Sequence, residues 1–133
     1  MSILYTINII LVAILLYFGG TWVYYRLRGR QLNGAMSPED FESTMRKAQI
    51  IDTREKSEFD AKHILGARNL PYTQMKMYAN ELRKDLPVYV YDRSVNAAIR
   101  STGRLKKYGF TDVYWLNQGF SDWQGKTKKT TKL

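Results

Sequence analysis

The chain has 133 residues, a formal net charge of +9 and no cysteine. This length leaves room for one small domain, and the missing cysteine excludes disulfides, thiolate metal sites and thiol nucleophiles. The positive charge is concentrated at two flanks, in Arg26, Arg28 and Arg30 and in the lysines of residues 126–132. A nucleic-acid-binding domain more often carries its basic residues along one element of the folded body, so this distribution argues against nucleic acid as a partner.

Residues 1–25 are predicted to be a transmembrane anchor. No Asp, Glu, Lys, Arg or His occurs in residues 2–25, and the apolar residues 3–25 are long enough to cross the hydrocarbon of a lipid bilayer as a helix. Trp22 and Tyr24 lie near one end of the segment, where aromatic rings favour the membrane interface. A cleaved signal peptide fits poorly, because it needs basic residues before the apolar run and small residues at a cleavage site.

Residues 26–35 are predicted to be a basic juxtamembrane linker. Arg26, Arg28 and Arg30 follow the apolar segment directly and suit anionic lipid headgroups. Because basic loops stay on the cytoplasmic side, we expect a single-pass protein of a cell membrane, interpreted as bacterial, with its N-terminus outside and its domain in the cytoplasm. The basic tail, residues 125–133, is expected either to be a disordered solubilising end or to meet the same headgroups.

Residues 36–124 alternate between strand and helix patterns. Ser37 and Pro38 suit the cap and first position of a helix, and Gly109 suits a helix C-terminus. Strands are predicted at 49–52, 67–71, 88–91 and 113–116, and helices after Ser37, within 53–62, at 72–84, at 97–108 and before Trp123. This alternation predicts an α/β domain with a parallel sheet covered by helices on both faces.

The turn after the strand at 88–91 is the sharpest candidate site. Ligands of such sheets bind beyond the carboxyl ends of the strands, and backbone N–H groups at the start of a helix can cradle an anion. The residues of this loop are Asp92, Arg93, Ser94, Val95, Asn96 and Ala97. Three further residues, Asp52, Arg54 and the single histidine His63, are expected to fix the surrounding loops or to pack, not to contact a substrate.

Several blocks of the sequence resemble, in order, those of a rhodanese-like (sulfurtransferase) domain. They are Ile50-Ile51-Asp52-Thr53-Arg54-Glu55, Glu58-Phe59, His63-Ile64-Leu65-Gly66-Ala67-Arg68-Asn69-Leu70-Pro71, Tyr91-Asp92-Arg93-Ser94, Gly109-Phe110, Val113-Tyr114-Trp115-Leu116 and Gly119-Phe120-Ser121-Asp122-Trp123. The resemblance covers nearly all of residues 36–124. It implies the rhodanese-like fold, a parallel sheet flanked by helices, here preceded by a single transmembrane helix.

The resemblance also places the main departure from that family at Asp92. In the family, the loop begins with a cysteine that carries a persulfide, and Asp92 occupies the matching position. Val95 stands where many active members have glycine, and Ala97 where they often have arginine. A carboxylate cannot take up sulfane sulfur and pass it on, because that chemistry needs a thiolate.

Three functions remain open. The first is a catalytically inactive rhodanese-like module, tethered to the membrane through residues 3–25, which binds or regulates an unknown protein partner through the exposed Arg93 and Ser94. In this reading Asp92 accepts the N–H groups of its own loop, caps the following helix and replaces a bound anion. The second is a sulfurtransferase-family enzyme with an unrecognised Asp-dependent activity such as phosphoryl transfer. The third is a folded cap on a helix that assembles with other membrane proteins.

Other residues receive simpler interpretations. The sequence shows no metal-binding cluster and calls for no cofactor. The cationic residues of the predicted helix at 97–108 are expected to form a solvated face, or to meet lipid headgroups: Arg100, Arg104, Lys106 and Lys107.

Overall fold

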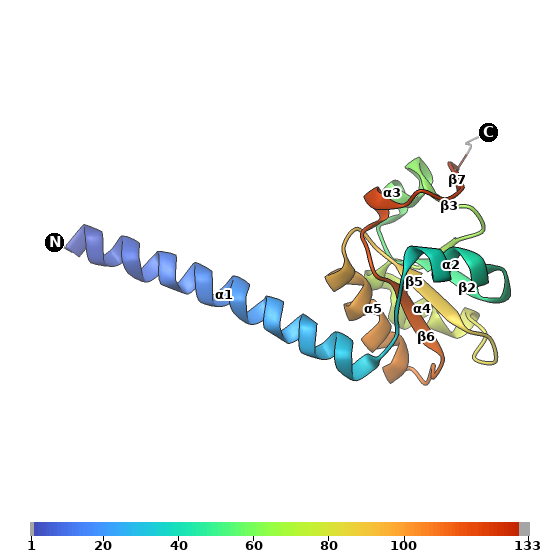
Figure 1. Ribbon diagram of the computed structural model, residues 1–133, viewed down its shortest axis with the longest axis horizontal. Coiled ribbons are helices and arrows are strands. Elements are labelled where there is room, and N and C mark those ends of the chain that lie inside the picture. The colour runs from blue at the N-terminus through green and yellow to red at the C-terminus, as the bar shows by residue number, and fades with distance from the viewer. Residues whose placement is uncertain (1, 131–133) are drawn as a thin grey trace. The chain divides into compact units, whose positions relative to one another are not determined.

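The computed structural model describes residues 2–130 and divides after Leu32 into two compact units. The first unit is helix α1, Ser2–Leu32 (Figure 1). Its most apolar 18-residue window has a mean hydropathy of 2.2, and by length and composition the helix can cross a membrane. The hydroxyl groups of Thr6 and Thr21 donate hydrogen bonds to backbone carbonyl groups of the same helix, which satisfies them without external partners.

The predicted linker is shorter than expected, because α1 continues beyond Tyr25 to Leu32. The arginines of residues 26–30 therefore belong to the last two turns of the helix, where positive charge suits the helix dipole. Gly29 lies inside the helix, although glycine costs about 1 kcal/mol there relative to alanine. Asn33 has a φ of 50° and ends the helix in the left-handed region that asparagine tolerates. Only Asn33 and Gly34 separate α1 from the first strand.

The second unit contains the predicted parallel sheet. Its strands occur in the order β1-β6-β5-β2-β4, and every neighbouring pair is parallel. Three of these strands were predicted from their apolar runs and are confirmed, namely β2 (Gln49–Asp52), β5 (Val88–Tyr91) and β6 (Val113–Leu116). The edges are two-residue strands, β1 (Ala35–Met36) and β4 (Arg68–Asn69), of which β4 falls within the predicted extended segment and β1 was not predicted.

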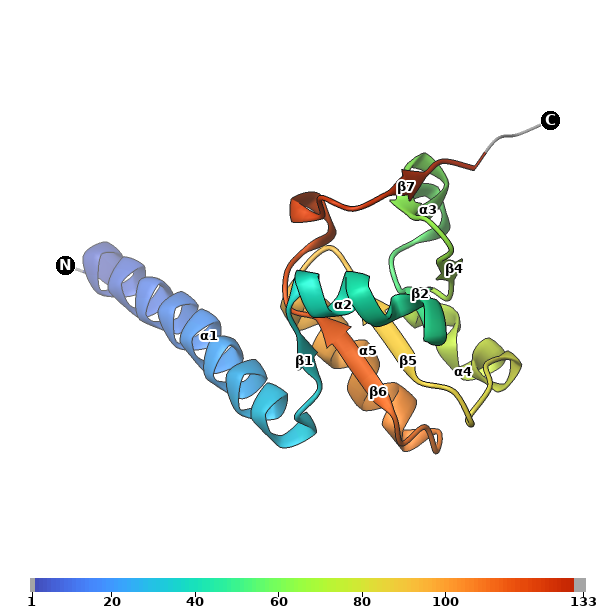
Figure 2. The same cartoon turned by 45° about the vertical axis from the view of Figure 1, so that its right-hand side comes forward.

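Helices cover both faces of the sheet. Helix α2 (Pro38–Thr44) lies on one face, and α4 (Met75–Tyr78) and α5 (Val95–Lys107) lie on the other (Figures 1 and 2). Under α2, Phe41 packs with Ile50, Tyr89, Tyr91, Leu116, Phe120 and Trp123 in one buried cluster. Since successive strand residues point to opposite faces, the buried Ile51, Val88 and Val90 serve the α5 side.

Helix ends follow the predicted capping chemistry. Ser37 accepts a hydrogen bond from the N–H of Asp40 at 3.2 Å, with Pro38 at the first helical position of α2. Helix α5 ends at Lys107, and the following Gly109 has a φ of 97° that favours glycine. Helix α5 begins at Val95, two residues before the predicted start.

The predicted helix at 72–84 is instead a series of three short turns. They are the 3-10 turn η2 (Tyr72–Gln74), α4 (Met75–Tyr78) and the 3-10 turn η3 (Ala79–Glu81). Of the four apolar residues predicted to be the buried side of this helix, Met75, Ala79 and Leu82 are buried and Tyr78 is exposed. The other short elements are η1 (Met45–Lys47), α3 (Lys56–Ala61) and η4 (Phe120–Asp122).

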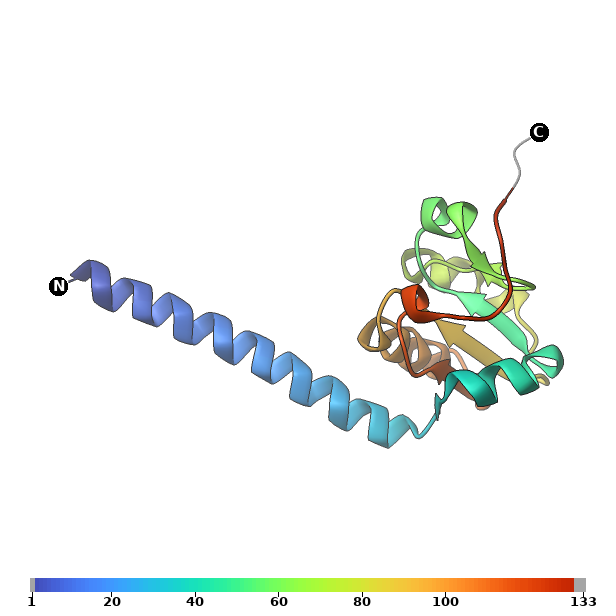
Figure 3. The ribbon, with the colours of Figure 1, turned by 45° about the horizontal axis from the view of Figure 1, so that its top comes forward.

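Part of the basic tail is ordered against the domain. After η4 the chain turns back over the domain (red in Figure 3), and β7 (Thr127–Lys128) pairs antiparallel with β3 (His63–Ile64). The carbonyl of Lys126 and the N–H of Thr130 make further backbone hydrogen bonds, of 3.0 and 2.9 Å. A disordered tail is therefore wrong for residues 126–130, and residues 131–133, with Lys132, lie outside the described part of the chain.

Candidate functional site

The candidate loop begins where two neighbouring strands end together. Strands β2 and β5 pair in a register that sets Asp52 beside Tyr91, and the N–H of Thr53 donates to the carbonyl of Tyr91 at 3.2 Å. The residues that directly follow the two strands, Thr53 and Asp92, therefore meet at the carboxyl edge of the sheet. This is the edge at which a parallel sheet collects its functional side chains.

Asp92 points inward and is almost completely buried, with 3% of its surface exposed. Its Oδ2 accepts a hydrogen bond from the Thr53 hydroxyl at 2.5 Å, and its Oδ1 accepts one from the Arg93 N–H at 2.6 Å. The backbone carbonyl of Asp92 accepts from the N–H of Phe120 at 3.0 Å. Both carboxylate oxygens are thus held by neutral donors of the protein, and no described Lys, Arg or His makes an ion pair with this carboxylate.

The cap of α5 is Ser94, which corrects the expectation that Asp92 would cap this helix. The Ser94 hydroxyl accepts from the N–H of Ala97 at 3.2 Å, and its carbonyl accepts from the N–H of Ala98. The Asp92 carboxylate accepts only the first N–H of the loop, that of Arg93. Because α5 starts at Val95, Asp92 lies too far before the helix to cap it.

The exposed part of the loop is formed by Arg93 and its neighbours. The side chain of Arg93 is 69% exposed, and its Nε lies 3.4 Å from Oε2 of Glu58 in α3. Val95 and Ala97 are half-buried, whereas Ser94 and Asn96 are exposed. The six residues predicted for the site therefore divide into one buried carboxylate and a solvent-facing rim.

Asp52 and Arg54 form a buried ion pair beside this loop. Arg54 Nη2 and Nε reach Oδ2 of Asp52 at 2.7 and 3.1 Å, and Arg54 Nη2 also donates to the carbonyl of Lys62. Burial lowers the pKa of Arg54, but the hydrogen bonds and charge of Asp52 outweigh it, so the net shift is upward. The guanidinium lies 4.2 Å above the ring of Phe120. The pair joins three chain segments and leaves little of either side chain exposed.

His63 is buried between its neighbours. Its Nδ1 lies 2.7 Å from the carbonyl oxygen of Phe59, and its ring stacks on the Phe59 ring with centroids 3.8 Å apart. Because a carbonyl only accepts, Nδ1 carries the proton in this contact. This geometry is the packing and hydrogen-bonding arrangement expected for His63.

Tyr91, which pairs with Asp52 across β2 and β5, contributes a buried hydroxyl group. That hydroxyl accepts a hydrogen bond from the N–H of Ile64 at 3.0 Å. Burial raises the pKa of Tyr91 far above its usual value, and the charge of Asp52 raises it further. Tyr91 is therefore protonated at neutral pH and acts as a neutral hydrogen-bonding group that joins β5 to β3.

Three residues that contact the site stand in the blocks that resemble the family but were not predicted to be site residues. Thr53 binds Asp92, Glu58 pairs with Arg93, and Phe120 lies under Arg54. Thr53 follows Asp52 at the end of its strand, as Asp92 follows Tyr91, but only the register of β2 against β5 brings the two together. The contacts of Glu58 and Phe120 connect distant segments and leave no local signal.

A comparison with known proteins agrees with this fold. The family model for the rhodanese-like domain matches residues 37–126. The uncharacterized protein YqhL of Bacillus subtilis is 41% identical over 120 residues, covering 90% of this chain and 92% of YqhL. An alignment of that length cannot fit within the second unit alone, so it extends into α1.

Two more distant proteins complete the comparison. The thiosulfate sulfurtransferase GlpE of Tolumonas auensis is 28% identical over 75 residues, which cover 56% of this chain and 71% of GlpE. The solved structure of the rhodanese-like domain from the Anabaena Alr3790 protein superposes with a TM-score of 0.67 at 23% identity, covering 72% of this chain and 79% of that chain. The chain belongs to the rhodanese-like domain family.

Proposed function

We propose that this chain is a membrane-anchored rhodanese-like module that binds or regulates a partner and has no sulfur-transfer activity. The observation that carries the proposal is the burial and hydrogen bonding of the Asp92 carboxylate. We assign Asp92 to the position of the family's nucleophilic cysteine. Its two carboxylate oxygens accept hydrogen bonds from Thr53 and Arg93 and are turned away from solvent. A carboxylate held in this way faces the interior of the domain and is not presented to a substrate at the loop.

Composition supports the inactive state independently of geometry. Sulfur transfer in this family requires a thiolate that attacks the donor and then carries the sulfur, and the chain contains no cysteine at any position. The alternative of an Asp92-dependent activity needs a free carboxylate oxygen within reach of a substrate. Both oxygens are engaged, so the geometry favours a binding role.

The exposed rim of the loop is the surface we assign to a protein partner. Arg93 is the most prominent side chain there, and its single ion pair with Glu58 is exposed enough to be exchanged for an outside carboxylate at small cost. The anchor is α1, whose apolar length suits a bilayer. The arginines in its last two turns, Arg26, Arg28 and Arg30, support an orientation with the domain in the cytoplasm.

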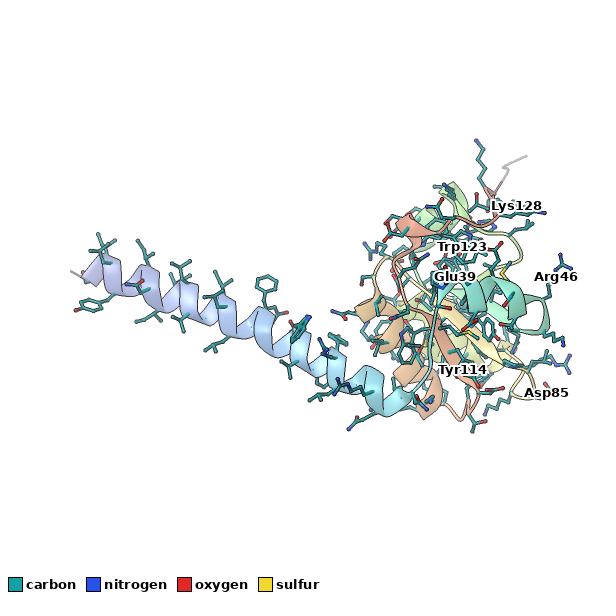
Figure 4. All side chains as sticks on the ribbon, in the orientation of Figure 1. Glu39, Arg46, Asp85, Tyr114, Trp123 and Lys128 are labelled. Carbon is teal, nitrogen blue, oxygen red and sulfur yellow. The ribbon has the colours of Figure 1, made fainter. Side chains whose placement is uncertain are left out.

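Sulfur transfer from thiosulfate to cyanide tests the inactive state. We expect the purified chain to produce no more thiocyanate than a heat-denatured sample, and turnover above that level would overturn the proposal. Asp92→Cys alone is expected to restore little activity, because Val95 and Ala97 still shape the cradle. Asp92→Cys combined with Val95→Gly and Ala97→Arg is expected to exceed the single variant. Asp85→Cys, which lies in an exposed ion pair away from the loop (Figure 4), is the matched control for adding a thiol.

The cysteine-free chain also allows a direct test of anchoring and orientation. A single cysteine at the exposed position 85 is expected to react with a membrane-impermeant maleimide only after the cells are permeabilised. The labelled protein is expected to stay in the membrane fraction after an alkaline carbonate wash. Labelling of intact cells contradicts the orientation, and release by carbonate contradicts the anchor.

A further inference from the structure

A pair of arginines on α5 is held in place by aromatic rings. The guanidinium groups of Arg100 and Arg104 lie 4.0 and 4.7 Å from the centre of the same ring, that of Tyr72. Arg104 Nε also donates a hydrogen bond to the Tyr108 hydroxyl at 2.9 Å. Since these residues are one helical turn apart, both guanidinium groups are presented from one side of α5.

These two arginines differ from most others in the domain, because no carboxylate pairs with them in the described residues. Arg54, Arg68, Arg83 and Arg93 each form an ion pair with an Asp or Glu. Helix α5 contains no acidic residue, and Glu81 and Asp85, which are close to Lys84 in the sequence, pair with Arg68 and Arg83. The guanidinium edges of the stacked pair are therefore available to an outside anion.

Two lysines extend the cationic surface toward the end of α5. Lys107 is exposed in the last turn, and Lys84 places its Nζ 5.5 Å from the ring centre of Phe110, just beyond the helix. We call the surface formed by Lys84, Arg100, Arg104, Lys107, Tyr72 and Tyr108 the α5 patch. It combines arginine forks held by stacking with tyrosines, which have an apolar body and a polar tip.

This combination suits phosphate groups at a lipid surface. A guanidinium donates two parallel hydrogen bonds to a phosphate, and stacking on a ring reduces the freedom lost on binding. Tyrosine rings favour the boundary between headgroups and hydrocarbon. We propose that the α5 patch binds the phosphate groups of anionic lipids in the same membrane that holds α1. This inference rests on the membrane anchoring proposed above.

The connection to α1 favours a lipid surface over a soluble anion. Only Asn33 and Gly34 separate α1 from the domain, and a short tether keeps a second binding surface at an effective concentration in the millimolar range. Contacts too weak to recruit a free protein are then sufficient for docking. Attachment through α1 therefore keeps the α5 patch close to the lipids that it is proposed to bind.

The topology of the domain places the tether close to the strand that α5 covers. The Gly34 carbonyl accepts from the Trp115 N–H at 2.8 Å, and a Cβ on Gly34 would lie 2.7 Å from the carbonyl oxygen of Val113, the first residue of β6. Helix α5 packs on β5 and β6 and returns the chain from the carboxyl end of β5 to the start of β6. Its cationic last turn therefore lies at the end of the sheet where the strands begin, and Asp92 lies at the other end.

A pair of single-cysteine variants of the full chain tests the docking. Thr73→Cys places a spin label on an exposed position beside Tyr72, and Ser43→Cys places the same label on an exposed position of α2, across the sheet. Each is reconstituted in nanodiscs of phosphatidylcholine alone or mixed with phosphatidylglycerol, with a small fraction of nickel-chelating lipid to shorten the relaxation of labels near the headgroups. We expect the Thr73 label, and not the Ser43 label, to relax faster in the anionic nanodiscs. Equal relaxation of the Thr73 label in both lipids would overturn the proposal.

Charge neutralisation identifies the residues responsible. Arg100→Gln with Arg104→Gln is expected to lower the ratio of docked to free domain about 30-fold, the effect of removing two surface cations. Arg46→Gln with Lys47→Gln removes the same charge from exposed positions of η1, directly after α2 (Figure 4 labels Arg46), and is expected to leave the ratio unchanged. An equal effect of the two pairs would overturn the assignment to the α5 patch. Equal thermal unfolding midpoints of both double variants show that the domain is intact.

The outcomes separate this inference from the proposed function. A chain that fails to incorporate into nanodiscs refutes the anchoring, whereas a chain that incorporates but shows no lipid dependence at position 73 refutes only the docking. Photocrosslinking from position 73 in cells distinguishes the remaining source of anions. A crosslink to a protein, with no lipid adduct, would overturn the proposal in favour of an acidic protein partner.

Discussion

Two buried carboxylates stand at the ends of neighbouring strands, and their partners are of opposite kinds. Asp52 is fully buried and neutralised by the guanidinium of Arg54. Asp92 is almost as buried but is held by a hydroxyl and a backbone N–H. Removing Asp52 therefore leaves a buried cation without its partner, whereas removing Asp92 leaves only neutral groups. The difference predicts that Asp52 contributes more to the stability of the fold than Asp92 does.

The largest expected effect comes from breaking the buried ion pair. Asp52→Asn keeps the shape of the side chain but leaves Arg54 uncompensated, which costs about 3–5 kcal/mol of unfolding free energy. Urea unfolding in detergent, followed by the fluorescence of the buried Trp115 and Trp123, measures this loss. Asp85→Asn, which removes an exposed partner of Arg83, is the control and is expected to change the midpoint little. A similar loss in both variants would contradict the structural role of the Asp52 pair.

A smaller loss is expected at Asp92. Asp92→Ala leaves the Arg93 N–H without its acceptor and leaves the Thr53 hydroxyl with only the Tyr91 carbonyl, at 3.3 Å. The expected cost is about 1–3 kcal/mol. The same urea titration measures it, with Thr53→Val removing one of the two donors as a partial control. A loss as large as that of Asp52→Asn would show that Asp92 also anchors the fold, and it would remove the contrast between the two carboxylates.

The central strands were predictable because their sequences carry strong local signals. Val88–Tyr91 and Val113–Leu116 combine β-branched and aromatic residues, and both are buried strands. The edge strand β1 has only two residues, and its pairing with β6 depends on a distant segment. The pairing of β7 with β3 was missed for the same reason, since the Lys/Thr composition of the tail suggests disorder. A strand held by one partner far along the chain leaves little trace in its own residues.

The place of Asp92 directly after β5 was predictable from the sequence, but its hydrogen bonds were not. The block matching the family's loop identified Asp92 and its neighbours. The helix after it was predicted to begin at Ala97, and Asp92 was separately expected to cap that helix; the structure has its start at Val95 and its cap at Ser94. A serine directly before Val95 was a local sign of the true start, because serine is a preferred capping residue. The Thr53 contact depended on strand register, which no local pattern specifies.

The buried Tyr91 beside Asp52 gives a pH-dependent prediction. Burial and the charge of Asp52 raise the pKa of Tyr91 in the folded state, so above about pH 10 the unfolded tyrosine loses a proton that the folded one keeps. Stability is therefore full below pH 10 and falls above it, by about 1.4 kcal/mol per pH unit for this one group. Tyr91→Phe is expected to remove the contribution of one proton, about 1.4 kcal/mol per pH unit, from the slope of unfolding free energy against pH. Tyr78→Phe, at an exposed position, is expected to leave the slope unchanged. An unchanged slope in Tyr91→Phe would show that another group causes the alkaline loss.

The smallest expected effect separates the cap from the buried carboxylate. Ser94→Ala removes the acceptor of the Ala97 N–H and is expected to cost about 1 kcal/mol of unfolding free energy. Its signature is faster hydrogen exchange of the Ala97 amide, because that N–H loses its partner at the frayed start of α5. Asp92→Asn keeps Ser94 in place and is expected to leave exchange at Ala97 unchanged while altering the Arg93 amide. If Asp92→Asn instead speeds hydrogen exchange of the Ala97 amide, the carboxylate and the Ser94 cap act as one unit. The start of α5 then depends on a charge at position 92.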